Sequence, residues 1–168
     1  SMGKNLSEMT LEELWQLFPI FLTEPNPAWA MWFSEEKEHL LRTLPEKAVF
    51  SINHIGSTAI NGIWAKPIVD ILLEVNDDFQ LKDLKDDVKN AGYILMNQTE
   101  NRLSFNKGYT ENGFAERVFH LHLRYKGDHD ELYFRDYLIA HPDTAKEYED
   151  LKLKLWKLYE HDRDGYTN

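Results

Sequence analysis

The stretch Pro67-Ile68-Val69-Asp70-Ile71-Leu72-Leu73-Glu74-Val75 limits the possible folds of this chain more than any other. A nearly continuous apolar run of this length, opened by a proline, is typical of a strand inside a sheet. Asp70 lies within the run, where an ionised carboxylate meets apolar neighbours at a heavy desolvation cost. We therefore expect a cation beside Asp70. Strand alternation places Glu74 on the same face, and Asn76 and Asp77 after it predict a solvated strand end.

The rest of the pattern predicts a single α+β domain over residues 1–168, with a mixed or antiparallel sheet of about five strands flanked by helices. Ser1 precedes Met2, so we expect at least Ser1 to be a cloning remnant. The expected strands are 49–55, 68–75, 93–96, 103–109 and 114–125. The expected helices have caps at Thr10, Asn26, Asp128 and Asp143, and a further amphipathic helix is expected from the pattern that begins with Asp77 and Asp78. In the last helix, one apolar stripe is expected from Tyr148, Leu151, Leu155 and Leu158.

Composition argues against several functional classes. The 168 residues carry 19 Lys and Arg against 29 Asp and Glu, a formal net charge of −10. Such a field repels phosphate backbones, so we expect no nucleic-acid partner. The chain has no cysteine, and no apolar run approaches the ~20 residues that cross a bilayer. We expect a cytoplasmic protein without a membrane partner that acts on a small molecule or nucleotide. The sequence leaves its oligomeric state open.

A second informative segment, His54-Ile55-Gly56-Ser57-Thr58, ends a predicted strand with glycine and hydroxyl residues. In this composition, the amides and hydroxyls of Gly56, Ser57 and Thr58 can cradle a phosphate at the start of a following helix. The alternative is a plain turn in which Ser57 caps that helix. His54 is expected either to orient the turn or to make a structural hydrogen bond. Lys66 is held extended by Pro67 and suits a phosphate, although an exposed lysine is equally compatible.

Two histidines share one face of the strand that contains Arg117-Val118-Phe119-His120-Leu121-His122-Leu123-Arg124. His120 and His122 together with Asp70 form a candidate metal site if the two strands are neighbours. Mixed His and Asp ligands favour manganese or zinc over magnesium as the divalent metal. Arg117 or Arg124 is the expected source of further positive charge. Arg135, in Phe134-Arg135-Asp136-Tyr137, is either an anion-binding arginine or one partner of a surface ion pair.

Several motifs resemble the GrpB family of small bacterial proteins. The resemblance covers most of the chain, and its order and spacing are more specific than an isolated Gly-Ser pair. It is carried by His54-Ile55-Gly56-Ser57-Thr58, Ala65-Lys66-Pro67-Ile68-Val69-Asp70, His120-Leu121-His122-Leu123, Phe134-Arg135-Asp136-Tyr137-Leu138, Ala140-His141-Pro142 and the ending Asp162-Arg163-Asp164-Gly165-Tyr166.

This resemblance implies a nucleotidyltransferase-like α+β fold, in which a glycine-serine turn holds a nucleoside triphosphate and acidic strand residues hold divalent cations. It assigns Gly56 and Ser57 to the turn and Asp70 to the first acidic position. The chain departs from the pattern at the second acidic position, which is Leu72, and His120 or His122 occupies the third. Two-metal phosphoryl transfer depends on oxygen ligands that bridge the ions, so the departure argues against ordinary nucleotidyl transfer.

Three functions fit these residues. The first is a metal-dependent transferase that moves a nucleotidyl or phosphoryl group to a small molecule, with Asp70, Lys66 and His54 as its catalytic residues. The second is a non-catalytic sensor or accessory module that binds a nucleotide or another anion. The third is a hydrolase that uses one metal-bound water at Asp70, His120 and His122.

Overall fold

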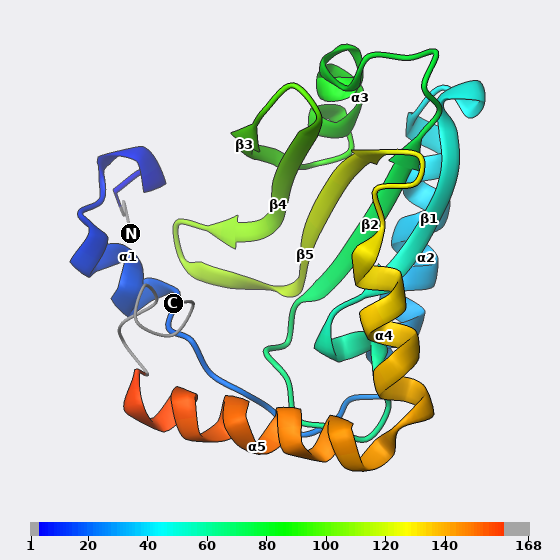
Figure 1. The fold of residues 1–168 in the computed structure, drawn as a ribbon. Helices are drawn as coiled ribbons and strands as arrows, with labels where there is room; N and C mark the ends of the chain where they lie inside the picture. The colour runs from blue at the N-terminus through cyan, green and yellow to red at the C-terminus, as the bar shows by residue number, and fades with distance from the viewer. Residues whose placement is uncertain (1–3, 160–168) are drawn as a thin grey trace.

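One five-stranded mixed sheet forms the centre of the protein (Figure 1). The computed structural model describes residues 4–159, so the GrpB-like ending at 162–166 lies outside the described residues. In spatial order the strands are β1 (Val49–Ile55), β2 (Val69–Val75), β5 (Gly113–Tyr125), β4 (Arg102–Thr110) and β3 (Ile94–Gln98). β2 pairs with β5 in parallel, and the other neighbours are antiparallel. The five strands and the α+β class predicted from the sequence are confirmed.

Within residues 4–159, five α-helices accompany the sheet: α1 (Leu11–Leu17), α2 (Ala28–Thr43), α3 (Lys85–Asn90), α4 (Asp130–Ala140) and α5 (Pro142–Leu158). Short 3₁₀ turns lie at Leu6–Glu8, Glu46–Ala48, Ser57–Ala59 and Leu81–Leu84. The predicted capping box at Thr10 is confirmed, because Thr10 accepts from the amide of Glu13 and the Glu13 carboxylate accepts from the amide of Thr10. Within the described residues, no helix has the length and apolarity that would let it cross a membrane.

The two faces of the sheet differ in chemistry. The face beneath α2 and α3 is the main core, in which Ile71, Leu73, Leu121 and Phe105 are all fully buried. The opposite face carries cross-strand neighbours that are mostly polar, including Asp70 beside His120 and Glu74 beside Arg124. A smaller apolar cluster of Ile60, Ile63, Leu138 and Ala145 joins α4 and α5 to the segment after β1. The polar face therefore offers the surface on which a site is built.

Two predicted helix caps are wrong. α4 begins after His129, and the Asp128 carboxylate accepts hydrogen bonds from Arg102 and Arg124 instead of capping the helix. α5 begins at Pro142, so Asp143 lies inside its first turn. Proline has no backbone N–H that would need a partner at the first helical position. The helix can therefore start at Pro142, one residue before the cap predicted at Asp143.

The predicted apolar stripe of α5 is also wrong. Leu151 and Leu158 are 56% and 69% exposed, while Ala145 and Glu149 are buried. The inward face of α5 runs through Ala145, Tyr148, Glu149 and Lys152 and includes a charged residue at its centre. Glu149 belongs there because it accepts a hydrogen bond from the Trp64 amide and one from Lys146 at 3.2 Å. The polar contacts of Glu149 and the apolar packing of Ala145 and Tyr148 together set the rotation of this helix.

Candidate functional site

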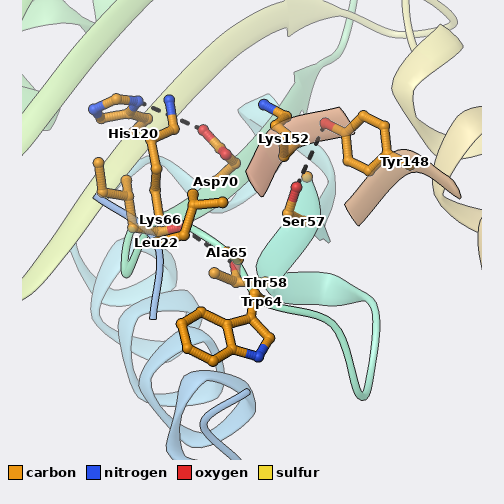
Figure 2. Close-up of a pocket in the computed structure, with 12 residues that line it drawn as sticks. Leu22, Ser57, Thr58, Trp64, Ala65, Lys66, Asp70, His120, Tyr148 and Lys152 are labelled. Atoms are coloured by element: carbon orange, nitrogen blue, oxygen red, sulfur yellow. Dashed lines mark hydrogen bonds and ion pairs between the residues drawn. The ribbon is translucent and has the colours of Figure 1, made fainter. Parts of the chain in front are cut away.

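A small pocket of about 110 Å³ opens where the polar face of β2 and β5 meets the segment after β1 and helix α5 (Figure 2). In Figure 2, Asp70 lies between His120 on one side and Ser57, Tyr148 and Lys152 on the other. The residues whose polar groups line the pocket are Ser57, Lys66, Asp70, His120, Tyr148 and Lys152. Five segments therefore contribute to one cavity, namely the turn after β1, the loop before β2, β2, β5 and α5.

The turn that bounds the pocket needs glycine at position 56. Gly56 has φ +75°, and a β-carbon placed there would lie 2.6 Å from Asp70 Oδ2. The backbone of the turn thus packs directly against the aspartate, as the sequence pattern predicted when it linked them. The residues after the glycine form only the 3₁₀ turn Ser57–Ala59. The expected α-helix after the turn is absent, so any anion there would meet hydroxyl and side-chain donors and not a helix dipole.

Thr58 and His54 hold the turn from inside the protein. The Thr58 hydroxyl donates to the Ile68 carbonyl at 3.3 Å, so it accepts from His54 Nε2, which lies 2.8 Å away. The His54 ring also stacks on Phe33 of α2, with ring centroids 5.0 Å apart. Burial lowers the pKa of His54 to about 4; Asp70 opposes this shift and Arg135 reinforces it. His54 is therefore a neutral hydrogen-bond donor to the turn at physiological pH.

Asp70 and the two histidines of β5 come together as the sequence predicted. Asp70 Oδ1 lies 3.4 Å from His122 Nε2 and 3.6 Å from His120 Nδ1. The other ring nitrogen of His120 lies 2.7 Å from the Tyr109 hydroxyl of β4. The contact between Asp70 and His120 follows from register, because the two residues are cross-strand partners. Tyr109 reaches His120 from beyond the register shift in β4, where its own cross-strand partner is Phe114. The strands thus place a row of hydrogen-bonding side chains along the pocket floor.

The Asp70 carboxylate is ionised at neutral pH. Burial by itself disfavours the charge and raises the pKa, but the hydrogen bond from His122 and the positive charges of His120, His122 and Lys66 outweigh burial. The pKa of Asp70 therefore lies below its ordinary value. Its side chain is 30% exposed, so the carboxylate is reachable from the pocket.

A metal ion does not fit the described side chains well. Among residues 4–159, no group of three or more His, Asp or Glu side chains is arranged to hold a metal ion. The Tyr109 hydroxyl occupies one nitrogen of His120, and the second acidic position is Leu72, whose side chain is fully buried. With Asp70 as its one carboxylate, the site lacks the further oxygen ligands that a two-metal centre requires. We therefore derive no step through a metal.

The predicted cationic residues go to different places. Lys66 lines the pocket. Arg117 instead pairs with Glu35 of α2 and lies over the Trp32 ring, with 5.6 Å between its guanidinium carbon and the ring centroid. Arg124 is buried and binds Asp128 and Glu131, at 2.8 Å in the latter pair. The structure does not bring either arginine to the pocket.

Arg135 belongs to the scaffold of the turn. Its guanidinium donates to Asn53 Oδ1 at 3.3 Å and to the His54 carbonyl at 3.1 Å, and it also pairs with Asp136. It therefore ties α4 to the end of β1, immediately before Gly56. This placement answers the question that the sequence left open, because the guanidinium is committed to backbone and side-chain acceptors.

Two pocket residues were missed by sequence reasoning. Tyr148 and Lys152 both reach the pocket from α5, and the Ser57 hydroxyl lies 3.5 Å from the Tyr148 hydroxyl. Their spacing of four residues puts them on one helix face. That spacing was the available signal, but Tyr148 was assigned to the apolar stripe and Lys152 was not considered as a site residue.

Glu74, predicted as a solvated strand end, is instead 1% exposed, and this prediction is wrong. Its carboxylate accepts from the Ser51 hydroxyl at 2.7 Å, the Gly127 amide at 2.9 Å and His129 Nδ1 at 2.8 Å. Burial raises its pKa, but these donors and the charge of His129 outweigh burial and lower the pKa overall. Glu74 is a structural carboxylate that joins β1, β2 and the β5–α4 turn.

Comparison with known proteins agrees with the motifs and the fold. The GrpB protein family matches residues 19–168. The chain belongs to the GrpB family. The glutamate-rich protein GrpB of Alkalihalophilus pseudofirmus is 38% identical over 159 residues, covering 89% of this chain and 88% of that protein. The UPF0157 protein YqkA of Bacillus subtilis is 40% identical over 134 residues, but this chain spans only 38% of its length.

Solved structures place this GrpB chain among nucleotidyltransferase-like folds. A crystal structure of GrpB from Enterococcus faecalis superposes with a TM-score of 0.75 and 31% identity, covering 87% of this chain and 88% of that one. The Cid1 poly(U) polymerase superposes with a TM-score of 0.57 over 89% of this chain and 47% of its own. At 12% identity the second likeness shows the fold alone.

Proposed function

We propose that this GrpB protein binds the phosphate group of a small molecule, with nucleotides as the first class to test, and does not transfer that group. The observation that carries the proposal is the charge of the pocket. The ammonium groups of Lys66 and Lys152 line it together with the His120 ring and the Ser57 hydroxyl, against the single carboxylate of Asp70. Lysine ammonium groups and hydroxyls are common phosphate ligands, and a pocket of about 110 Å³ suits one phosphate group.

The fold supports a nucleotide as the ligand. The Cid1 poly(U) polymerase, a neighbour in fold, was solved with MgGTP bound. In the present chain, the glycine-serine turn that the GrpB resemblance assigns to triphosphate binding lies at the pocket. A phosphate-binding role for the turn thus agrees with both the local chemistry and the fold.

Transfer is the weaker proposal. The metal-dependent transferase and the single-metal hydrolase both require an ion at Asp70, His120 and His122, and these side chains do not form a metal-holding group in the described chain. A nucleotidyl transfer also needs a second acidic ligand where Leu72 stands. Lys66 and Lys152 supply positive charge without an ion, which suits retention of a ligand.

The test measures the melting temperature and calorimetric binding with pyrophosphate, ATP and GTP, first in EDTA and then with magnesium, manganese or zinc. We expect binding in EDTA, because the cationic residues belong to the protein. A ligand at 100 times its Kd adds about 2.7 kcal/mol to the free energy of unfolding, which is readily detected. Lys152→Ala should weaken pyrophosphate binding about tenfold, since it removes a charged partner of the phosphate.

Lys37 of α2, which is partly exposed and does not line the pocket, provides the matched control Lys37→Ala. Its affinity should equal that of the wild-type protein. Binding that requires a divalent metal and is followed by release of pyrophosphate from ATP would establish the transferase instead. Absence of binding by all three ligands under every condition would refute phosphate recognition at this pocket.

A further inference from the structure

The phosphate pocket is too small for a whole ligand. Pockets that bind small molecules typically enclose roughly 300–1,000 Å³, whereas this cavity measures about 110 Å³. A ligand whose phosphate lies between Ser57, Lys66 and Lys152 must therefore extend beyond these residues. The chemistry of the cavities beside the pocket indicates which kind of group the rest of that ligand carries.

The floor of the pocket continues across the sheet in one row. Asp70 is the cross-strand partner of His120, His120 of Asn106, and Asn106 of Ile94. Cross-strand partners lie on the same face of a sheet. At ~4.8 Å per strand, the row spans about 14 Å from Asp70 to Ile94. It changes from charged to apolar along its length.

The far end of this row is the floor of an apolar groove of about 570 Å³ between α1 and the β3–β4 edge. Its lining is largely apolar and includes Leu11, Leu14, Trp15, Phe18, Ile94 and Met96. Ile94 and Met96 are 51% and 57% exposed, so their side chains are accessible from the groove. α1, blue in Figure 1, lies on the β3–β4 side of the molecule.

A direct side-chain contact joins the two cavities. His120 lines the phosphate pocket, Tyr109 lines the groove, and the Tyr109 hydroxyl lies 2.7 Å from His120 Nε2. The Tyr109 ring packs on Phe18, with centroids 5.0 Å apart, which fixes the ring at the boundary. The His120 side chain is 25% exposed, so a ligand can lie across this pair with its phosphate in the pocket and its remainder in the apolar groove.

We propose that the ligand is an amphiphilic phosphate, namely a phosphate ester whose apolar chain lies in this groove. The inference rests on the proposed phosphate-binding function and names the class of its ligand. The groove has the volume that the pocket lacks, and burial of a hydrocarbon chain against its apolar lining is favourable. The roof of the groove, Leu6 to Phe18, precedes the family match at 19–168.

Another cavity, of about 390 Å³, adjoins the pocket on the side of α2 and shares Thr58 with it. Thr58 is only 7% exposed, and its hydroxyl already bonds His54 and the Ile68 carbonyl. It therefore forms a wall between the two spaces, and a ligand does not pass that way. A further cavity, which shares Lys66 and Ile68 with the pocket, measures only about 100 Å³ and is too small for the rest of a ligand. The apolar groove has the volume for it.

The test uses methyl, n-butyl and n-octyl phosphate at concentrations below micelle formation, with calorimetric measurement of Kd. Each methylene buried in the groove should tighten Kd three- to four-fold, since burial of a CH₂ contributes ~0.8 kcal/mol. We expect octyl phosphate to bind at least tenfold more tightly than butyl phosphate. Octyltrimethylammonium, which has the chain and the opposite charge, should bind no better than butyltrimethylammonium.

Met96→Glu places a charge in the groove and should remove the dependence on chain length while leaving methyl phosphate binding unchanged. The matched control is Met31→Glu on α2, a methionine of similar exposure (51% against 57%) that does not line the groove. If methyl phosphate and pyrophosphate bind but chain length has no effect, or the effect persists in Met96→Glu, the groove proposal fails alone. If no phosphate binds, the proposed function fails with it.

Discussion

The two carboxylates of β2 lie on one face of one strand, four residues apart, and have opposite surroundings. Glu74 is 1% exposed and accepts three hydrogen bonds of 2.7–2.9 Å from Ser51, Gly127 and His129. Asp70 is 30% exposed and has contacts of 3.4 and 3.6 Å with two imidazoles at the edge of a pocket. Both carboxyl pKa values lie below their ordinary values.

This contrast shows that a lowered pKa does not identify a functional carboxylate by itself. At Glu74 the negative charge is satisfied entirely by short internal hydrogen bonds, so a ligand has no access and the residue stabilises the fold. At Asp70 the positive partners are farther away and the carboxylate reaches an open cavity. The site follows from the combination of charge, longer contacts and accessibility, and the predictions below test that distinction.

The largest effect is expected at the sealed end of β2. Glu74→Ala leaves the Ser51 hydroxyl, the Gly127 amide and His129 without their acceptor, and should lower the free energy of unfolding by roughly 3–5 kcal/mol. Urea denaturation at pH 7 measures the change. Leu72→Val, a smaller change in the neighbouring buried residue of the same face, serves as a control for packing and should cost roughly 0.5–1.5 kcal/mol. A loss below about 1 kcal/mol for Glu74→Ala would show that the three hydrogen bonds are not stabilising.

Near the pocket, His54 of β1 should make the free energy of unfolding depend on pH. Burial lowers the pKa of His54 from its ordinary 6.5 to about 4, so the unfolded chain binds a proton there before the folded protein does. Stability is therefore complete above pH 6.5 and is lost as the pH falls toward 4, by up to about 3 kcal/mol. His54→Gln retains a donor for Thr58 and should flatten the decline between pH 6.5 and 4.5. Urea denaturation across that range measures the slope, and equal slopes in the two proteins would contradict the neutral buried imidazole.

Much of the fold follows from local pattern. The apolar run of β2, the alternation of β5 and the Thr10 capping box each determine an element from adjacent residues, and each prediction is confirmed. The meeting of Asp70 with His120 and His122 was also predictable, because alternation fixes the shared face and a neighbouring pair of strands brings the side chains together.

The rest depended on contacts between distant residues. Glu74 has polar neighbours in sequence, and only the β5–α4 turn, which supplies Gly127 and His129, buries it. The rotation of α5 depends on the bond between Glu149 and the Trp64 amide, 85 residues away in sequence. Without that rotation, the pocket roles of Tyr148 and Lys152 are not visible. Helical spacing gives a face but not the direction in which the face points.

A smaller effect is expected at Gly56, where the turn touches Asp70. Gly56→Ala introduces a β-carbon 2.6 Å from Asp70 Oδ2 at a backbone φ of +75°. The left-handed conformation and the displaced carboxylate should together reduce the free energy of unfolding by about 1–2 kcal/mol and weaken pyrophosphate binding. Gly62→Ala, at φ +82° with open space around it, carries the backbone penalty alone. If the two variants bind pyrophosphate equally well, the close approach of the turn to Asp70 has no role in the pocket.

The smallest change in stability is expected at Asp70 itself, where the comparison with Glu74 is most direct. Asp70→Asn removes a charge that is 30% exposed and has only long contacts, so the free energy of unfolding should change by less than about 1 kcal/mol. Pyrophosphate binding in EDTA should stay the same or become tighter, because the substitution removes the negative charge nearest to the anion. Calorimetry in EDTA and in manganese measures both cases. A ligand held through a metal would behave in the opposite way, because loss of the carboxylate would abolish the metal-dependent part of its binding. That result would contradict the anion pocket and identify Asp70 as a metal ligand.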